Sequence, residues 1–334
     1  LLRRLTQSLI SQEEKKWLPN TFPIIKDSRL VVQRIEQMNT YIQEAMEDKA
    51  KTKNLYNITN NTVLISIAAD IKKMYPSITP ALIVKTIDVH LLKLISSYPQ
   101  DSENHKAAKN LREMMIPLII FLLEHAFIYI QQGDLKTFFR QIVGIPTGAS
   151  YSDSLASFTV YLLECPMLKK LKDKHIEPLV YSRFVDDTFI QILSEKDQAE
   201  NTIESIKEAL NSMDPCLTYT VESTITFLLG KPKKQEGTPT PFLDLNTKPT
   251  LYEDGKFRVE VDILPKPKAT PPHTPWLSAQ PLSVKLSTLQ TERHRYLTRC
   301  TTEPFFRKNW DCLVKDLTSV GYPRKDEISP PPPR

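Results

Sequence analysis

The sequence predicts an α+β fold in which an antiparallel sheet packs on helices, and two observations predict it. Segments rich in β-branched and aromatic residues recur between stretches that carry apolar residues at helical spacing. Short turn sequences, GD at 133–134 and EDGK at 253–256, join neighbouring strands as hairpins, so that these strands run antiparallel. The 334 residues suffice for one large or two medium domains with a substantial core.

The elements follow from local pattern and turn chemistry. Strands are expected at 61–71, at 217–223, 225–231, 241–248 and 256–266, and on both sides of the bends at 133–134 and 186–187. Thr79 is the expected N-cap of a helix that has Pro80 at its first position. The other expected helices cover 13–18, 29–51, 114–130, 152–171, 195–213 and most of 282–322.

The composition is that of a globular protein with a mild basic excess. Hydrophobic residues make up 40% and charged residues 25% of the chain, which excludes a disordered protein. The 44 basic and 39 acidic residues give a net charge of +5. The excess is concentrated at 281–315, which suits a polyanionic partner, although a solvated helix face has the same pattern. The four cysteines lack CxxC spacing, which argues against zinc and against a disulfide framework.

The most apolar stretch, MMIPLIIFLLEHAFIYI at 114–130, is just short of a membrane span. It also carries Pro117, Glu124 and His125. We therefore expect a buried core helix and no membrane partner. The chain opens LLRRL without a methionine, which is consistent with a fragment of a longer protein.

Three segments carry the residues from which chemistry can be argued: ADIKKMYPSI at 69–78, GIPTGASYSDSLA at 144–156 and FVDD at 184–187. Each has an ordinary explanation alone, as a strand end, a tight turn and a hairpin bend. Phosphoryl transfer from a nucleoside triphosphate uses two divalent cations, and magnesium prefers hard carboxylate oxygens. Asp70 and Asp186 are far apart in sequence, so only tertiary structure can bring them together. Asp186 and Asp187 can both reach a metal only at a bend, because successive strand side chains point to opposite faces.

In this order the three segments describe a nucleic-acid polymerase palm, and from about residue 61 to 323 the chain resembles a reverse transcriptase. The resemblance is closest to the Penelope-like element group, which is related to telomerase catalytic subunits. DIKKMYPSI resembles that family's first palm motif, and GIPTGASYSDSLASFTVYLLE resembles its glycine-bearing motif. RFVDDTFI resembles RYVDDTFV, PFLDL resembles the FLD motif, and TERHRYLTRC followed by VGYP resembles the helical thumb.

The resemblance implies a right-hand polymerase fold with partial fingers. Residues 1–60 would be a partial fingers or N-terminal helical segment, 61–264 the palm with finger elements, 265–281 a proline-rich connection, 282–323 a helical thumb and 324–334 a disordered tail. It implies an RNA-directed DNA polymerase with Mg²⁺, or Mn²⁺, as cofactor. The partners would be an RNA template, a DNA primer and dNTPs. A nuclear location is the default, with an organelle as the alternative, and the chain is either a mobile-element product or a host protein.

The resemblance also assigns roles to individual residues. Asp70 and Asp186 would be the catalytic metal ligands, with Asp187 as a supporting carboxylate. The nucleotide-binding residues would be Tyr75, which would exclude a ribose 2′-hydroxyl, and Gly144, Thr147 and Gly148. Nucleic acid would be bound by Arg293, Arg295 and Arg299 in the thumb and by Phe242 and Leu243 in the FLDL hairpin.

A purely structural role is the alternative at several of these positions. Tyr75 and the pair Phe242 and Leu243 would also suit a protein core, and the three arginines would suit a solvated helix face. Arg183 is either a structural partner of the palm or a contact to backbone phosphate.

The chain also departs from the family pattern. Thr147 stands where Gln or Met is usual, and Asp153 stands in place of a proline. WLPNTFPIIKDSR lacks most of the basic residues of the fingers, with Lys26 and Arg29 as the candidate substitutes. These departures keep a second function open, a degenerate or repurposed module that binds nucleic acid without efficient synthesis. An RNA-dependent RNA polymerase is a more distant alternative, because FVDD and Tyr75 favour deoxynucleotides.

Overall fold

The computed structural model describes residues 2–14, 23–47, 58–229, 235–264 and 273–323. The chain divides into two compact units. Unit 1 contains residues 1–24, 69–188 and 200–222, and unit 2 contains residues 25–68, 189–199 and 223–334. No helix in the described ranges is long and apolar enough to cross a bilayer.

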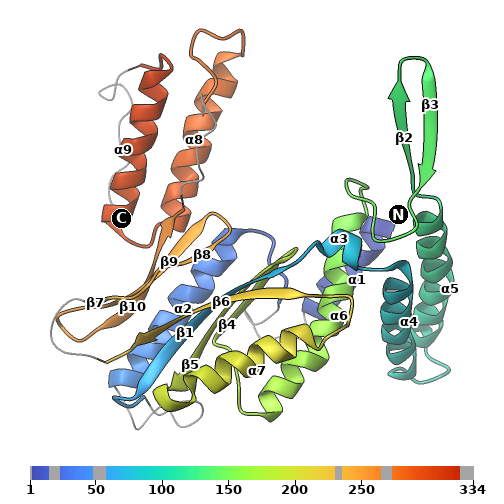
Figure 1. Ribbon diagram of the computed structural model, residues 1–334, viewed down its shortest axis with the longest axis horizontal. Helices are drawn as coiled ribbons and strands as arrows, with labels where there is room; N and C mark the ends of the chain where they lie inside the picture. The colour runs from blue at the N-terminus through green and yellow to red at the C-terminus, as the bar shows by residue number, and fades with distance from the viewer. Residues whose placement is uncertain (1, 15–22, 48–57, 230–234, 265–272, 324–334) are drawn as a thin grey trace. The chain divides into compact units, whose positions relative to one another are not determined.

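Unit 1 is built on a group of packed helices. α6 (Ser152–Asp173) contacts both α1 (Leu2–Glu14) and α4 (Pro80–Ser96), and α5 (Glu103–Glu124) packs along α4. The α4 start is the predicted one, because Thr79 Oγ1 accepts a hydrogen bond from Leu82 N at 3.2 Å and Pro80 occupies the first turn. Figure 1 shows α6 beside α1. α6 is buried along most of its first half, which includes Phe158 and Tyr161. This packing makes α6 the central helix of unit 1.

A four-stranded sheet has the strand order β4-β5-β1-β6, with β1 (Thr62–Ile71) between β5 (Asp187–Glu195) and β6 (Tyr219–Phe227). β4 (Val180–Phe184) is joined to β5 through the residues Val185 and Asp186. β1 is buried from Thr62 to Ile67, as its run of β-branched residues predicts. α7 (Ala199–Asn211) connects β5 to β6 after the short 3₁₀ turn η1 (Lys196–Gln198). This order brings the end of β1, where Asp70 lies, beside the start of β5.

Unit 2 contains a second antiparallel sheet with strand order β10-β9-β7, on which β8 also pairs with β9. Its strands are β7 (Gln235–Glu236), β8 (Thr240–Phe242), β9 (Leu245–Leu251) and β10 (Phe257–Ile263). α2 (Ser28–Glu47) packs on β10, and Asn39 exchanges two hydrogen bonds with the Val259 backbone. α8 (Leu282–Arg299) and α9 (Glu303–Ser319) pack together around the buried residues Trp310, Leu313, Val314, Leu317 and Tyr322.

Several predicted elements differ from the observed ones. The two strands expected at 217–223 and 225–231 are one strand, β6, because Ser223 and Thr224 carry no turn signal and continue the extended chain. The strand expected at 241–248 is instead the β8–β9 hairpin, in which Phe242 pairs with Leu245 and Leu243 adopts a φ of 57°. The predicted hairpin around EDGK is confirmed, with Gly255 at a φ of 82° between β9 and β10.

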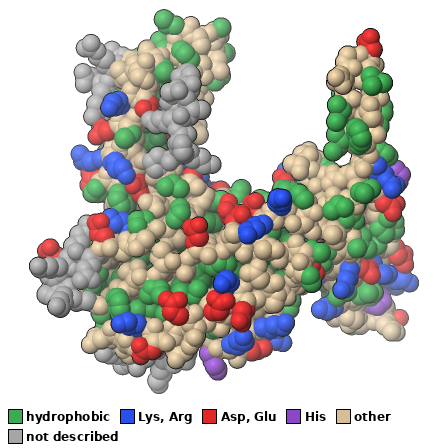
Figure 2. All heavy atoms as spheres, viewed as in Figure 1, with side chains coloured by type: hydrophobic (Ala, Val, Ile, Leu, Met, Phe, Trp, Pro, Cys, Tyr) green, Lys and Arg blue, Asp and Glu red, His purple; other side chains and the backbone are tan. Residues whose placement is uncertain are grey.

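The prediction that the apolar stretch 114–130 forms a single buried helix is wrong. α5 ends at Glu124, and Phe127 starts the predicted hairpin of β2 (Phe127–Gln132) and β3 (Leu135–Arg140). Only one face of α5 is buried, and Phe121 remains 55% exposed. All twelve hairpin residues are exposed, and Figure 2 shows their hydrophobic side chains on the surface. High hydrophobicity in this segment therefore does not indicate burial within unit 1.

Candidate active site

Asp70 and Asp186 lie at neighbouring strand ends in unit 1. The Ile71 amide donates a hydrogen bond to the backbone oxygen of Asp186 at 3.3 Å, which fixes the two segments side by side. The Asp70 side chain is exposed and Asp186 is half-buried. Partial burial and the negative charge of Asp186 raise the pKa of the Asp70 carboxyl above its usual value. Two like charges are thus held together at this edge, although 116 residues separate them in the chain.

The bend that carries the acids contains a backbone conformation that is unusual for its residue. Val185 has a φ of 57°, in the left-handed region that a β-branched residue rarely adopts. Such a conformation costs about 1–3 kcal/mol and persists only where the surroundings enforce it. Asp187 follows as the first residue of β5 and is half-buried like Asp186. The predicted bend is confirmed: Asp186 lies in it, and Asp187 directly follows it.

A buried arginine enforces this bend. Arg183 is fully buried, and its Nη1 donates to the Val185 carbonyl at 2.8 Å. Its Nε donates to Glu164 Oε1 at 2.8 Å, and its Nη2 donates to the Ser157 carbonyl at 2.9 Å. Burial would lower the pKa of Arg183, but the charge of Glu164 and their hydrogen bond outweigh burial and raise it. Arg183 is therefore a structural partner, and a contact to backbone phosphate is excluded.

Two tyrosines complete the polar group beneath the bend. Tyr181 donates its hydroxyl hydrogen to Glu164 Oε1 at 2.8 Å. Burial, and then the charge of Glu164, raise the pKa of Tyr181 well above its usual range. The Tyr219 hydroxyl and Glu164 Oε2 are buried without a hydrogen-bond partner among the described residues. Sequence reasoning missed Glu164, although a lone acid within the apolar stretch SLASFTVYLLECPML was a signal for a buried ion pair.

Tyr75 lies in the short helix α3 (Met74–Ser77), which directly follows β1. Its hydroxyl donates to Asp153 Oδ1 at 2.5 Å. Partial burial, this hydrogen bond and the charges of Asp153 and Asp186 all raise the pKa of Tyr75. The charge of Asp186 thus reaches Tyr75, and the ring lies at the same edge as the acids. Tyr75 is only half-buried, so it is not an enclosed core tyrosine.

The two predicted nucleotide-site glycines have different physical requirements. Gly144 has a φ of 79°, and a Cβ there would lie 2.6 Å from the Tyr75 carbonyl oxygen, so no other residue fits without a backbone shift. Gly148 has a φ of 87° but faces open space. Thr147, beside Gly148, is exposed. Gly144 therefore packs the loop against α3, whereas Gly148 and Thr147 leave an open surface.

The carboxylates suit a magnesium ion that is shared with a substrate. In the described part of the chain, no three His, Cys, Asp or Glu side chains form a ready-made metal cage. Magnesium needs no such cage, because it commonly takes one or two carboxylates together with substrate phosphates. Asp70 and Asp186 are hard oxygen donors, and their mutual repulsion would be relieved by a cation between them. The donor set therefore fits this metal.

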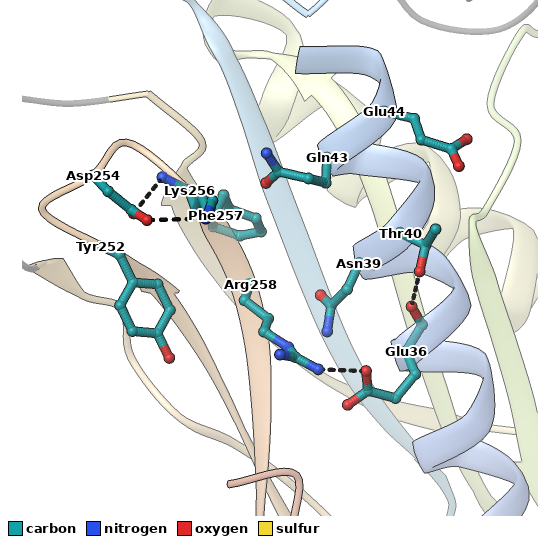
Figure 3. Close-up of a pocket in the computed structure, with 10 residues that line it drawn as sticks. All are labelled: Glu36, Asn39, Thr40, Gln43, Glu44, Tyr252, Asp254, Lys256, Phe257 and Arg258. Carbon is teal, nitrogen blue, oxygen red and sulfur yellow. Dashed lines mark hydrogen bonds and ion pairs between the residues drawn. The ribbon is translucent and has the colours of Figure 1, made fainter. Parts of the chain in front are cut away.

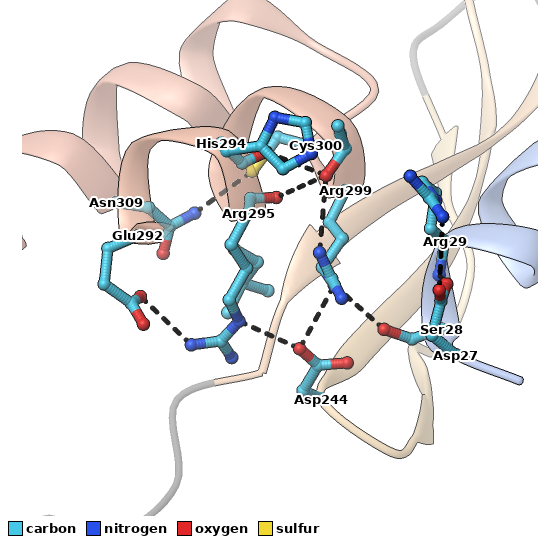
Figure 4. A network of polar contacts seen from close by, with 12 residues as sticks. Asp27, Ser28, Arg29, Asp244, Glu292, His294, Arg295, Arg299, Cys300 and Asn309 are labelled. Atoms are coloured by element: carbon cyan, nitrogen blue, oxygen red, sulfur yellow. Dashed lines mark hydrogen bonds and ion pairs between the residues drawn. The ribbon is translucent and has the colours of Figure 1, made fainter. Parts of the chain in front are cut away.

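The arginines predicted to contact nucleic acid lie in unit 2, and two of them have protein partners (Figure 4). Arg295 Nε donates to Asp244 Oδ2 at 3.0 Å, and its Nη1 donates to Glu292 at 3.1 Å. Arg299 lies 3.4 Å from the same Asp244 oxygen and donates to Ser28 Oγ at 2.9 Å. Burial would raise the pKa of Asp244, but the Ser28 hydrogen bond and the two arginines hold it below its usual range. Both arginines thus connect α8 to the β8–β9 turn.

The other residues predicted to contact nucleic acid lie in different environments. Arg293 is half-buried, and its Nε has no hydrogen-bond partner among the residues that the structure describes. Phe242 is 4% exposed and packs against Phe189 with ring centroids 5.3 Å apart, which is the core role that the sequence left open. Leu243 is half-buried at the turn. In the segment predicted to be partial fingers, Arg29 pairs with Asp27 at 3.4 Å, and residues 17–22 lie outside the described ranges.

A pocket of about 470 Å³ in unit 2 contains none of the predicted site residues (Figure 3). It lies between α2 and the β9–β10 hairpin. Two of its three acids are paired with its two bases: Arg258 pairs with Glu36 at 2.6 Å and Lys256 with Asp254 at 3.2 Å. Its lining residues are Glu36, Asn39, Thr40, Gln43, Glu44, Tyr252, Asp254, Lys256, Phe257 and Arg258.

Solved structures of telomerase share this fold at low sequence identity. Telomerase from Candida albicans, in complex with a TWJ fragment of telomeric RNA, matches with a TM-score of 0.58 and 11% identity over 96% of this chain and 48% of that one. Apo telomerase from Candida tropicalis gives 0.54 and 14% identity over 96% and 49%. The chain thus spans about half the length of these telomerase chains. No protein-family model and no curated protein sequence matches it. The chain therefore shares the fold of these telomerase chains.

Proposed function

We propose that this chain is an RNA-directed DNA polymerase that adds deoxynucleotides to a primer 3′-hydroxyl. The observation that carries the proposal is the meeting of Asp70 and Asp186 at adjacent strand ends, on a bend enforced by a fully buried arginine. Holding two negative charges together is unfavourable unless a cation neutralises them. The polymerase-like fold supports the same chemistry.

The candidate residues would have the following roles. Asp70 and Asp186 would hold Mg²⁺, or Mn²⁺, with Asp187 as a supporting carboxylate. The metal, when bound, would supply the positive charge that lowers the pKa of the primer hydroxyl and stabilises the leaving pyrophosphate. Tyr75 would lie against the sugar of the incoming nucleotide, and the open surface at Thr147 and Gly148 would receive the nucleotide. The template would be RNA, as the telomerase solved with telomeric RNA suggests.

Primer extension on an RNA template with dNTPs and Mg²⁺ or Mn²⁺ tests the proposal. Asp186→Ala should lower extension at least about 100-fold, because a catalytic metal stabilises the transition state by several kcal/mol. Asp101→Ala, which removes an exposed acid from the turn between α4 and α5, is the matched control and should extend like the parent. Circular dichroism should show that both variants remain folded. Extension by Asp186→Ala at the parent rate would refute the assignment.

A module that binds nucleic acid without synthesis is the second candidate. It is favoured by the segment WLPNTFPIIKDSR, which lacks most of the basic residues of the family's fingers and in which Arg29 pairs with Asp27 at 3.4 Å. The same assay separates the two candidates. Binding of an RNA–DNA duplex by the parent protein, with no extension under either metal, would favour the module.

A further inference from the structure

Asp153 makes a short hydrogen bond to the tyrosine at the candidate active site. The Tyr75 hydroxyl lies 2.5 Å from Asp153 Oδ1, across 78 residues of sequence. Asp153 is in the first turn of α6, where the helix dipole favours a negative charge. A hydrogen bond from a hydroxyl to a carboxylate is shorter and stronger than one between neutral groups. Nothing in the chemistry proposed above assigns a role to this carboxylate.

Both ends of this contact are anchored to the same loop. The Ile145 amide donates to the Tyr75 carbonyl oxygen at 2.8 Å, and Gly144 packs against the Tyr75 and Pro76 backbone. Ser152, the residue before Asp153, donates its hydroxyl hydrogen to the Pro146 carbonyl at 2.5 Å. The backbone of α3 and the start of α6 are therefore fixed relative to each other. The Tyr75 side chain is the part left free to rotate, and Asp153 holds it at its far end.

Because of where the Tyr75 ring lies, its hydrogen bond to Asp153 has a consequence for nucleotide binding. Tyr75 follows β1, which carries Asp70 near its end, and the charge of Asp186 acts on Tyr75. A nucleotide whose phosphates share a cation with these acids would place its sugar within reach of the ring. A ring held in one rotamer presents a fixed wall to that sugar, whereas a released ring can move aside for an additional hydroxyl group.

We infer that Asp153 is a positioning residue that holds the Tyr75 ring against the incoming sugar and so sets the preference for deoxyribonucleotides over ribonucleotides. This inference rests on the proposed polymerase function. The simpler role for Asp153, a first-turn acid that stabilises α6, predicts an effect on stability alone. The two roles therefore differ in whether sugar preference changes.

A double-mutant cycle distinguishes them. The ratio of ribonucleotide to deoxyribonucleotide incorporation is measured by primer extension for the parent, Tyr75→Phe, Asp153→Ala and the double variant. Each single change removes the same hydrogen bond, so each should raise the ratio about fivefold, and the double variant should exceed neither. Asp153→Asn keeps an acceptor for the tyrosine hydroxyl and should restore much of the preference. Asp173→Ala, at the other end of α6, is the control and should leave the ratio unchanged.

The other possible results would overturn this inference alone or the proposed function together with it. An unchanged ratio in Asp153→Ala, or effects that add in the double variant, would overturn the inference while the polymerase function stands. Loss of all extension in both folded Asp153 variants would also overturn it, because a residue that only selects the sugar leaves deoxynucleotide extension measurable. No extension by the parent would overturn the proposed function and this inference together.

Discussion

Arg183 shows how a buried residue can fix the bend that carries the acids proposed to be catalytic. Its guanidinium bonds to Glu164, to the Ser157 carbonyl and to the carbonyl of Val185, the strained residue before Asp186. The motif RFVDD predicted the bend but left two roles for the arginine, because sequence position alone does not reveal burial. Only the fold, which places Arg183 over the centre of α6, decides between the two roles.

Removal of one member of this pair should be strongly destabilising. Glu164→Leu leaves a buried guanidinium without its counter-charge and should lower the free energy of unfolding by about 3–5 kcal/mol, measured by urea denaturation. The double change Glu164→Leu with Arg183→Met should recover much of that loss, since a buried ion pair often adds little net stability. The double change does not restore the hydrogen bond that Arg183 donates to the Val185 carbonyl. Primer extension at the parent rate by a stable double variant would therefore contradict the positioning role of Arg183.

The hairpins and strands show which elements local sequence can predict. The turns at Gly133 and Gly255 were predicted because glycine allows positive φ without strain. Local pattern predicted a continuous strand through Leu243, because leucine rarely adopts the φ of 57° that it has here, whereas the family resemblance implied a hairpin at FLDL. Tertiary contacts fix that turn instead. Asp244, its next residue, is held by two arginines from α8 and by Ser28 at the start of α2.

The Asp244 carboxylate should make this turn sensitive to acid. Its pKa is lowered in the folded protein, so its contribution to stability is fully present above its unfolded value of about 3.8 and is lost as the pH falls through the folded value. Asp244→Asn should lower the free energy of unfolding by about 2 kcal/mol at pH 7, the usual size for a charged hydrogen bond. The difference from the parent should shrink below about pH 4. A difference in urea-denaturation stability that stays constant down to pH 3 would contradict the ion pairs.

For the whole molecule, motif order predicted that distant acids would meet, and the fold confirms that Asp70 and Asp186 lie on adjacent strand ends. Motif order could predict this meeting because the strand topology of the polymerase palm that the sequence resembles is known. It could not predict the ion pairs of Arg295 and Arg299, because the motifs PFLDL and TERHRYLTRC contain Asp244 and Glu292 but do not reveal that these acids pair with the arginines. It also could not predict that the apolar β2–β3 hairpin stands exposed.

Binding of nucleic acid by the whole chain should depend on salt, and Arg293 should account for about one unit of that dependence. The logarithm of affinity falls with the logarithm of salt concentration by about 0.9 for each phosphate contacted. Arg293 is the cleaner test in α8 because its replacement breaks no ion pair with a described residue, whereas changing Arg295 breaks two ion pairs. Arg293→Ala should weaken binding to an RNA–DNA duplex equally for unrelated sequences, because phosphate contacts carry no sequence information. Arg112→Ala, whose guanidinium is already paired with Asp88, is the control, and an equal loss of slope in both variants would refute a specific contact at Arg293.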